Sequence, residues 1–314
     1  MFITALKRTP IAISGLAIGI MALSNVFYHI NFKTLGLCSF IISCAIVLLF
    51  ITKWIVYPNM FLKELKNIHT FAISPTFPMT MMILASIIKQ EYAVQSQLLN
   101  VLWYAAILLH ICLIIIFISR YAFRNFKSWP NTSWFVMFVG TGVISETSTA
   151  FNQTFGHVST IFGTVCLALI LAYVLICKSW QTYNQEQFPM VIIMSAPAAL
   201  CLNGYILNNT NYSNVYIIIL LVLSQVLFIF TLIFLPKILQ RGFKVSFSAM
   251  TFPWVTTAAS IYNVTQHSHA SSSTITFGTI LSVIEITLAA IIVCYVLYQY
   301  VVFLTTKDVE YSRM

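Results

Sequence analysis

Residues 187–236 read QFPMVIIMSAPAALCLNGYILNNTNYSNVYIIILLVLSQVLFIFTLIFLP and contain no Asp, Glu, Lys or Arg. A transmembrane helix needs about 20 mostly apolar residues, so this stretch has room for two such helices joined by the polar turn at 208–214. The first half, 189–206, mixes apolar residues with Ser, Pro, Asn and Gly, whereas the second half, 215–235, is dense in Leu, Ile, Val and Phe. A bilayer tolerates the first kind of surface only against protein or water, while the second kind suits lipid.

The same alternation runs along the whole chain and gives ten apolar segments. The odd-numbered segments mix apolar residues with small and polar ones, and they lie at 10–28, 71–88, 134–150, 189–206 and 246–262. The even-numbered segments are dense in large apolar residues, and they lie at 35–57, 98–118, 160–177, 215–235 and 276–304. We therefore predict an all-α integral membrane protein with a single transmembrane domain over residues 1–314. Its ten transmembrane helices are expected to form five pairs, with an inner ring of five kinked odd helices around a pore and an outer ring of five even helices.

The overall composition excludes a soluble domain. Hydrophobic residues make up 60% of the chain and charged residues only 7%, and the mean hydropathy is +0.91. A soluble domain carries roughly a quarter charged residues. The formal net charge of +9 therefore indicates membrane topology and attraction to anionic lipid headgroups, and we expect no binding to nucleic acid.

The distribution of basic residues predicts the orientation. Only Lys33 and Lys89 fall on one side of ten spans. The other basic residues fall in the termini or in the connections from even to odd segments: Lys7, Arg8, Lys53, Lys63, Lys66, Arg120, Arg124, Lys127, Lys178, Lys237, Arg241, Lys244, Lys307 and Arg313. Basic residues accumulate on the cytoplasmic side of a membrane. We expect a multi-pass protein of the plasma membrane with both termini in the cytoplasm.

Prolines recur inside the odd segments at Pro78, Pro197 and Pro253, 119 and 56 residues apart. These distances fit a helix-pair unit of about 60 residues that repeats five times. Two of the prolines follow the same two residues, since the chain reads Thr-Phe-Pro at 76–78 and again at 251–253. A proline inside a helix removes a backbone hydrogen bond, so we predict helix kinks at all three. The first and fifth segments have glycines at the corresponding places: Gly15, Gly19, Gly140 and Gly142.

These motifs resemble the tellurite-resistance/dicarboxylate transporter family, which includes bacterial TehA and the slow anion channel of plant guard cells. The resemblance covers nearly the whole chain and is most specific at Ala249-Met-Thr-Phe252-Pro253, followed by Thr256-Thr-Ala-Ala-Ser260. It implies a homotrimer in which each protomer has its own pore of five kinked helices. It also implies that the ring of Phe252 plugs this pore. Phe77, in the other Thr-Phe-Pro phrase, is a second candidate for the pore gate.

Hydroxyl and amide side chains are the candidate pore lining, because no Lys or Arg lies in the middle of an odd segment. A fixed cation there would hold an anion too tightly to release it, whereas weak donors replace part of its hydration shell. The candidates are Ser14, Thr76, Thr80, Thr141, Ser145, Ser195, Asn203, Thr251, Thr256 and Ser260. For each of them the alternative is a hydrogen bond between packed helices.

Two carboxylates lie in or at the end of apolar segments, and such residues are functional candidates. Glu146 ends the fifth segment, where it is either a solvated carboxylate at the outer mouth or a group that couples proton movement to a dicarboxylate. Glu285 lies in the tenth segment and is a second candidate for proton or substrate coupling, but we expect a structural role against an inner helix or at the trimer interface.

Together, these observations favour a gated anion channel or uniporter for small inorganic or organic anions. The alternative is a proton-coupled transporter of C4-dicarboxylates such as malate, or a tellurite-resistance exporter, on the same fold. The sequence contains no Walker loop, zinc-protease helix or nucleophile elbow, and His267-Ser-His269 lacks a third ligand for a metal. We expect no enzymatic activity, no cofactor and no metal site.

Overall fold

The computed structural model describes residues 2–122, 130–209, 213–267 and 272–306, and in these ranges it contains helices and no strand. Within these ranges, seven helical segments are long and apolar enough to cross a membrane, and Ile13–His29 is a shorter apolar helix. The expected all-α membrane class is therefore confirmed. Four of the basic residues used to predict the orientation, Arg124, Lys127, Lys307 and Arg313, lie outside the described residues.

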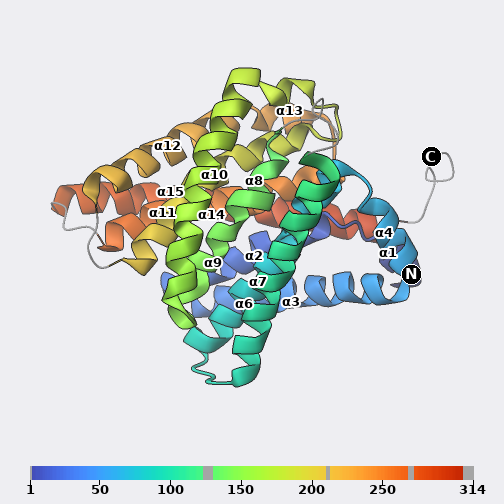
Figure 1. Cartoon of the computed structure of the whole chain (residues 1–314), viewed down its shortest axis with the longest axis horizontal. Coiled ribbons are helices and arrows are strands. Elements are labelled where there is room, and N and C mark those ends of the chain that lie inside the picture. Colours follow the sequence, from blue (N-terminus) through green and yellow to red (C-terminus); the bar gives the residue numbers. More distant parts are fainter. Residues whose placement is uncertain (1, 123–129, 210–212, 268–271, 307–314) are drawn as a thin grey trace.

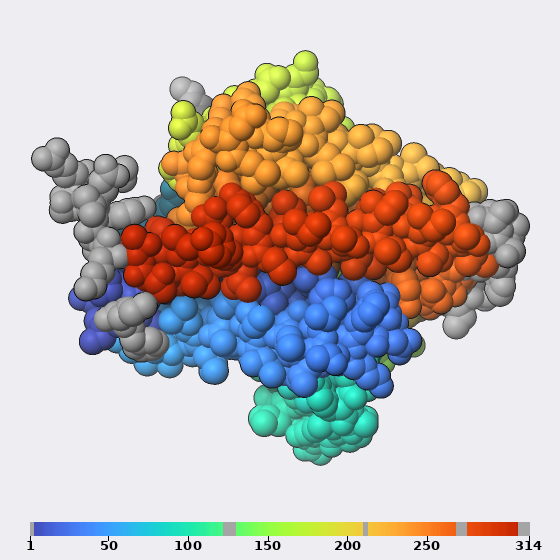
Figure 2. Space-filling model, turned by 180° about the vertical axis from the view of Figure 1, so that it is seen from behind, coloured from blue at the N-terminus to red at the C-terminus, as the bar shows by residue number. Residues whose placement is uncertain are grey.

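Long, uninterrupted helices cover the even-numbered segments of the sequence. They are α3 (Lys33–Val56), α7 (Gln97–Phe117), α10 (Gln153–Cys177), α12 (Asn214–Leu232) and α15 (Ser272–Thr305). Only 28–39% of the residues in their apolar windows are buried within the protein. The remaining Leu, Ile, Val and Phe side chains form an exposed surface that suits lipid. On the face drawn in Figure 2, α15 crosses between α3 and α12.

Interrupted helices cover the odd-numbered segments. The first is α2 (Ile13–His29), the third is α5 (Ile68–Ile73) with α6 (Thr76–Glu91), and the fifth is α8 (Ser133–Phe138), η3 (Val139–Thr141) and α9 (Gly142–Thr147). The seventh is η6 (Phe188–Ser195) with α11 (Ala196–Asn208), and the ninth is η7 (Val245–Met250) with α14 (Thr251–His267). In the apolar windows of the third and seventh segments, 72% and 89% of the residues are buried, so the polar side chains there are kept from lipid.

Short elements complete the described chain. They are α1 (Phe2–Arg8), α4 (Pro58–Glu64), η1 (Ile118–Ala122), η4 (Ser148–Ala150), η5 (Ser179–Thr182) and α13 (Leu235–Gln240). The helix α1 packs against α15, and Arg8 donates a hydrogen bond to the carbonyl oxygen of Thr306. The two ends of the described chain therefore lie on the same side of the molecule (Figure 1).

Each interrupted helix packs against the long helix that follows it in the chain: α2 on α3, α6 on α7, α9 on α10, α11 on α12 and α14 on α15. The interrupted helices also contact one another in a closed cycle, from α2 to α6, α9, α11 and α14 and back to α2. They lie in the middle of the view in Figure 1.

The prolines sit where helices begin, which corrects the expectation of a kink inside a continuous helix. Pro78, Pro197 and Pro253 lie in the first turns of α6, α11 and α14, each of which starts after a break or a 3-10 segment. A proline in the first turn costs no internal hydrogen bond, because the N–H groups there have no partner within the helix. The three prolines therefore fix helix starts halfway through their segments.

The first and fifth segments change pitch without a proline. In the first, the N–H groups of Ile13, Ser14 and Gly15 each donate to the carbonyl three residues earlier, which is a 3-10 pattern. In the fifth, the 3-10 turn η3 separates α8 from α9 at Gly140. All five interrupted segments thus have a change of helical pitch, with or without proline.

Candidate functional site

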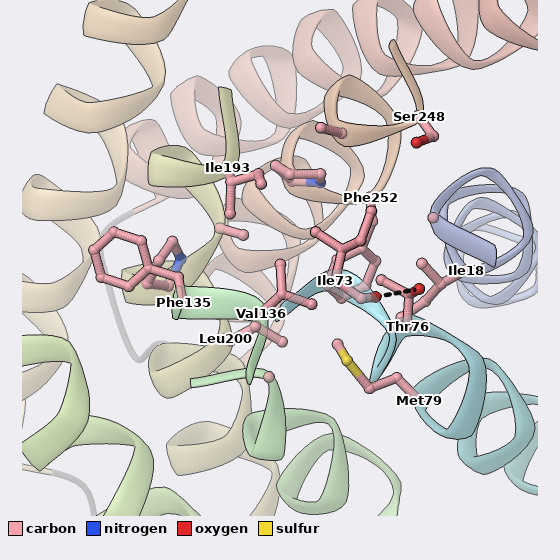
Figure 3. Close-up of a pocket in the computed structure, with 16 residues that line it drawn as sticks. Ile18, Ile73, Thr76, Met79, Phe135, Val136, Ile193, Leu200, Ser248 and Phe252 are labelled. Atoms are coloured by element: carbon pink, nitrogen blue, oxygen red, sulfur yellow. Dashed lines mark hydrogen bonds between the residues drawn. The ribbon is translucent and has the colours of Figure 1, made fainter. Parts of the chain in front are cut away.

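An apolar cavity of about 40 Å³ lies among the five interrupted segments, at the level of their pitch changes. We call it the inner cavity, and Figure 3 shows its lining. The lining residues are Gly15, Ile18, Ile73, Thr76, Met79, Phe135, Val136, Gly140, Ile193, Ala196, Pro197, Leu200, Ser248, Ala249, Phe252 and Pro253. Every interrupted segment contributes at least two of them, and none is charged. The pitch changes therefore bring one short stretch of each segment to a common space.

Phe252 is the largest side chain that α14 contributes to the inner cavity, and its ring points into the space (Figure 3). It is the second residue of α14 and directly precedes Pro253, in the short transition from η7 to α14. The side chain is only 7% exposed. A cavity of about 40 Å³ holds at most a few water molecules, so the space beside the ring is nearly closed.

Gly19 allows α2 to approach the backbone that carries this ring. A Cβ atom at residue 19 would lie 2.3 Å from Oγ1 of Thr251 and 2.9 Å from the amide nitrogen of Phe252. Both distances are shorter than a van der Waals contact. The hydroxyl of Thr251 also donates a hydrogen bond of 3.0 Å to the carbonyl of Gly15 on α2. The position of Phe252 is therefore fixed from the α2 side by a glycine contact and a hydrogen bond.

A second cavity, of about 190 Å³, follows along the same five segments, and we call it the outer cavity. Its lining is Ala22, Asn25, Val26, His29, Ile83, Ser86, Gln90, Glu146, Thr147, Thr149, Asn203, Leu207, Val255, Thr256, Ala259 and Asn263. In every segment these residues come later in the chain than those of the inner cavity. The five segments therefore run in the same direction past both cavities, and on α14 only one residue separates Pro253 of the inner cavity from Val255 of the outer one.

A chain of polar side chains crosses the lining of the outer cavity. The amide of Asn203 donates to Oε1 of Glu146 at 2.8 Å, and the amide of Asn263 donates to Oδ1 of Asn203 at 3.1 Å. These bonds connect α9, α11 and α14. Glu146 thus faces the enclosed space, while the neighbouring hydroxyls of Thr147 and Ser148 bond to protein groups. The structure places this carboxylate along the cavity.

Three of the ten predicted lining side chains, Thr76, Asn203 and Thr256, line a cavity. The other seven lie outside both linings, and their hydroxyls bond to backbone carbonyls: Ser14, Thr80, Thr141, Ser145, Ser195, Thr251 and Ser260. Ser145 bonds to Gly156 of α10 and Thr251 bonds also to Gly15 of α2, whereas the other five bond to a carbonyl of their own segment. The hydroxyl of Thr76 also lies 2.6 Å from that of Ser14, so it joins α6 to α2.

Sequence reasoning missed several polar residues of the outer cavity: Asn25, His29, Gln90 and Asn263. The sequence contained a signal for two of them, Asn25 and His29. On the first segment Ala22, Asn25, Val26 and His29 have the spacing of a single helix face. That face continues the line of Gly15 and Ile18 toward the end of the helix.

Two predicted residues lie away from both cavities. The ring of Phe77 stacks on Phe50 of α3, with centroids 4.9 Å apart, so the expectation that Phe77 lines the constriction is corrected. Glu285 is 3% exposed on α15 and lies against Gln225 of α12. It is thus buried within the protomer, next to another long helix, where we expected an inner helix or the trimer interface. Among the residues that the structure describes, no three His, Cys, Asp or Glu side chains gather into a metal site.

Long helices with lipid-exposed faces, packed around polar helices that enclose two successive cavities, define a multi-pass membrane protein of the transport class. The model of the SLAC1 family, described as voltage-dependent anion channel, matches residues 8–301, and the chain belongs to this family. The match confirms the resemblance seen in the sequence and makes the protein an anion channel or transporter. No curated protein matches the chain.

Proposed function

We propose that the chain is a gated anion channel or uniporter in which anions pass along the axis of the five interrupted segments. The observation that carries this proposal is that the same five segments line the inner and the outer cavity in succession. Their closed cycle of contacts supports an inner ring, and the long helices packed on them support an outer ring. The pathway then lies inside one chain.

We propose ten membrane crossings in five pairs, and the lengths of the interrupted segments support this proposal. The helix α14 has 17 residues, or about 25 Å, which is short of a bilayer core of about 30 Å. Together with the six residues of η7 it reaches that thickness. The interrupted helices need not be strongly apolar, because the long helices shield them from lipid.

The chemistry of the pathway suits anions that lose water readily. The inner cavity offers apolar walls, the hydroxyls of Thr76 and Ser248, and no fixed cation. The N-terminal ends of α2, α6, α11 and α14 lie at its level, and helix N-termini carry a partial positive charge. Such a site attracts an anion weakly and releases it, as conduction requires.

Phe252 is the proposed gate. Its ring occupies the narrow inner cavity, while the cavity directly beyond it is several times larger. Because the ring is carried by the first turn of α14, after a 3-10 segment, a small rotation of that turn moves it out of the path.

The test is anion flux into proteoliposomes for the wild type, Phe252→Ala and Phe77→Ala. The two variants remove the same ring from the same Thr-Phe-Pro phrase, but only Phe252 lies in the cavity. We expect the flux to rise at least about tenfold in Phe252→Ala, which corresponds to lowering the barrier by about 1.4 kcal/mol. Phe77→Ala should stay near the wild-type flux. Unchanged or lost flux in Phe252→Ala, or an equal rise in Phe77→Ala, would refute the gate.

A proton-coupled carrier of C4-dicarboxylates, or a tellurite exporter, makes different predictions on the same fold. Its flux would saturate with substrate and fail when Glu146 is neutralised, whereas channel currents keep rising with the driving force. The family match names an anion channel, so we propose the channel. We further propose a homotrimer in the plasma membrane with both termini in the cytoplasm, supported by the family resemblance and by the distribution of Lys and Arg.

A further inference from the structure

A groove that lies apart from both cavities combines aromatic walls with three cations. It is open to the outside, has a volume of about 610 Å³, and lies where α10 and α12 end. Its lining is Lys178, Trp180, Gln181, Tyr183, Phe188, Phe230, Phe234, Lys237 and Arg241. No Asp or Glu belongs to this lining. We call it the basic groove.

The aromatic rings of the basic groove form one connected cluster. Trp180 contacts Phe230, Phe230 contacts Phe234, and Phe234 contacts Phe188, with centroids 5.5, 5.1 and 5.9 Å apart. Trp180 comes from η5, Phe188 from η6 and Phe230 from α12, and Phe234 lies between α12 and α13, so the rings hold separate parts of the chain together. They provide a rigid apolar floor.

Two of the cations are positioned over this floor. Lys237 Nζ lies 5.3 Å and Arg241 Cζ lies 4.8 Å from the centroid of the Phe188 ring. Such cation–π contacts orient a side chain without neutralising its charge. Within the described ranges, the salt bridges are Lys53 with Glu64 and Lys244 with Glu186, so neither cation is paired with a carboxylate there. Their charge is available to an anionic ligand.

The groove adjoins the lipid-exposed surface. Ile176, near the end of α10, is 79% exposed, and Ile229 and Ile233, at the end of α12, are 60% and 69% exposed. Tyr183 and Trp180 are the residue types found at the level of lipid headgroups. A ligand in the groove thus meets cations at its polar end and exposed aliphatic side chains at its apolar end.

We propose that the basic groove binds an anionic phospholipid, with the phosphate headgroup against Lys178, Lys237 and Arg241 and the acyl chains along α10 and α12. Basic pockets between transmembrane helices bind anionic headgroups, since each Lys or Arg near the surface attracts them. A soluble phosphate would use only the cations. The adjoining apolar surface favours a lipid.

The experiment measures lipid binding to the purified protein in a neutral detergent, by native mass spectrometry, with phosphatidylglycerol and phosphatidylcholine of the same acyl chains. The groove variant is Lys178→Gln/Lys237→Gln/Arg241→Gln. The control variant, Lys7→Gln/Lys63→Gln/Lys66→Gln, removes the same charge from three exposed lysines outside the groove. A further arm offers inorganic phosphate as a competitor.

We expect the wild type and the control variant to bind phosphatidylglycerol in preference to phosphatidylcholine. In the groove variant the affinity for phosphatidylglycerol should fall by a factor of about 100, or roughly fivefold for each cation. Inorganic phosphate should compete weakly. If the triple variant fails to fold, Arg241→Gln alone should still show the fivefold loss.

Four results would overturn the proposal. Equal binding of the two lipids would show that the cations recognise no headgroup. An equal loss in the control variant would show general surface attraction. Strong competition by inorganic phosphate would assign the groove to a soluble anion. If the protein forms a trimer whose subunits cover the groove and no lipid binds, the groove is an interface with a second copy of the chain.

Discussion

Gly19 and Phe252 are in direct backbone contact: a Cβ atom at residue 19 would lie 2.9 Å from the amide nitrogen of Phe252. The helix α2 thus lies against the backbone of the proposed gate, more than two hundred residues further on. The contact depends on the missing side chain of the glycine. A larger side chain at residue 19 therefore tests whether this close packing holds the gate in place.

Gly19→Ala should destabilise the protein and displace the gate. The added methyl group overlaps Thr251, and overpacking of this kind costs about 1–3 kcal/mol. We expect a lower melting temperature of the purified protein and a higher basal anion flux in liposomes. Gly163→Ala is the control, because its Cβ would meet only Cys201 Sγ, at an ordinary 3.6 Å. If both variants behave alike, the close contact of α2 with α14 has no role in gating.

Glu146→Gln should raise anion flux by about twofold to fivefold in the proposed channel. The substitution removes an ionisable carboxylate from the lining of the outer cavity, and one charge at a few ångströms changes the energy of a passing anion by about 1 kcal/mol in water. The Gln side chain still accepts the hydrogen bond from Asn203. Flux is measured in proteoliposomes at low ionic strength, with Glu91→Gln, an exposed residue outside both cavities, as the control. Loss of flux in Glu146→Gln would favour the coupled carrier.

Lys53→Met should be strongly destabilising. The ammonium group of Lys53 is buried and donates to Glu64 and to the carbonyl of Thr9, while Glu64 Oε2 accepts from the N–H of Ile11 at 2.9 Å. Removing one partner of a fully buried pair costs about 3–5 kcal/mol, and because the Glu64 side chain that stays behind is 32% exposed, we expect a loss at the lower end of this range. Chemical denaturation in mixed micelles measures the free energy of unfolding.

Lys244→Met is the matched control for this pair. Its partner Glu186 is 63% exposed and the two charges are 2.8 Å apart, so the loss should stay below about 1 kcal/mol. Equal losses at Lys53 and Lys244 would show that burial of the first pair has no energetic consequence.

Tyr183→Phe should destabilise the protein at neutral pH and change its sensitivity to alkali. The Tyr183 hydroxyl accepts from the N–H of Thr132 at 2.9 Å and lies 2.6 Å from Oγ1 of Thr132, which itself donates to the carbonyl of Met190 at 2.7 Å. The chain of bonds connects the start of α8 to η6. Leaving its buried groups without a partner costs about 1–3 kcal/mol.

The pH dependence follows from burial, which raises the pKa of Tyr183 to about 12, from about 10 in an unfolded chain. A raised pKa in the folded state means that the stabilisation is complete below about pH 10 and is lost as the pH rises through about 12. As the pH rises from about 9 to about 12, the melting temperature should therefore fall more steeply for the wild type than for Tyr183→Phe. If the melting temperatures of the two proteins fall in parallel with pH, burial of the Tyr183 hydroxyl does not cause the loss of stability in alkali.

The amino-acid sequence by itself determined the class of the protein and the identity of its two kinds of helix. The predicted segment 35–57 is helix α3 at Lys33–Val56, and 215–235 is nearly α12 at Asn214–Leu232. Hydrophobic patterning is a local property of the sequence, and a helix that faces lipid is rich in large apolar residues along its whole length. The motif also singled out Phe252 as the candidate gate, although the sequence predicted a kink inside a continuous helix there and not the start of α14.

The tertiary structure alone decided which side chains meet. Phe252 and Phe77 occupy the same Thr-Phe-Pro phrase, yet one points into the inner cavity and the other stacks on Phe50. The rotation of a helix about its axis is set by its neighbours, so the sequence could not separate Thr76 and Thr256, which line cavities, from the hydroxyls that lie outside both linings. For the same reason the basic groove, which joins Lys178 to Arg241 across two helices, exists only once those helices have packed.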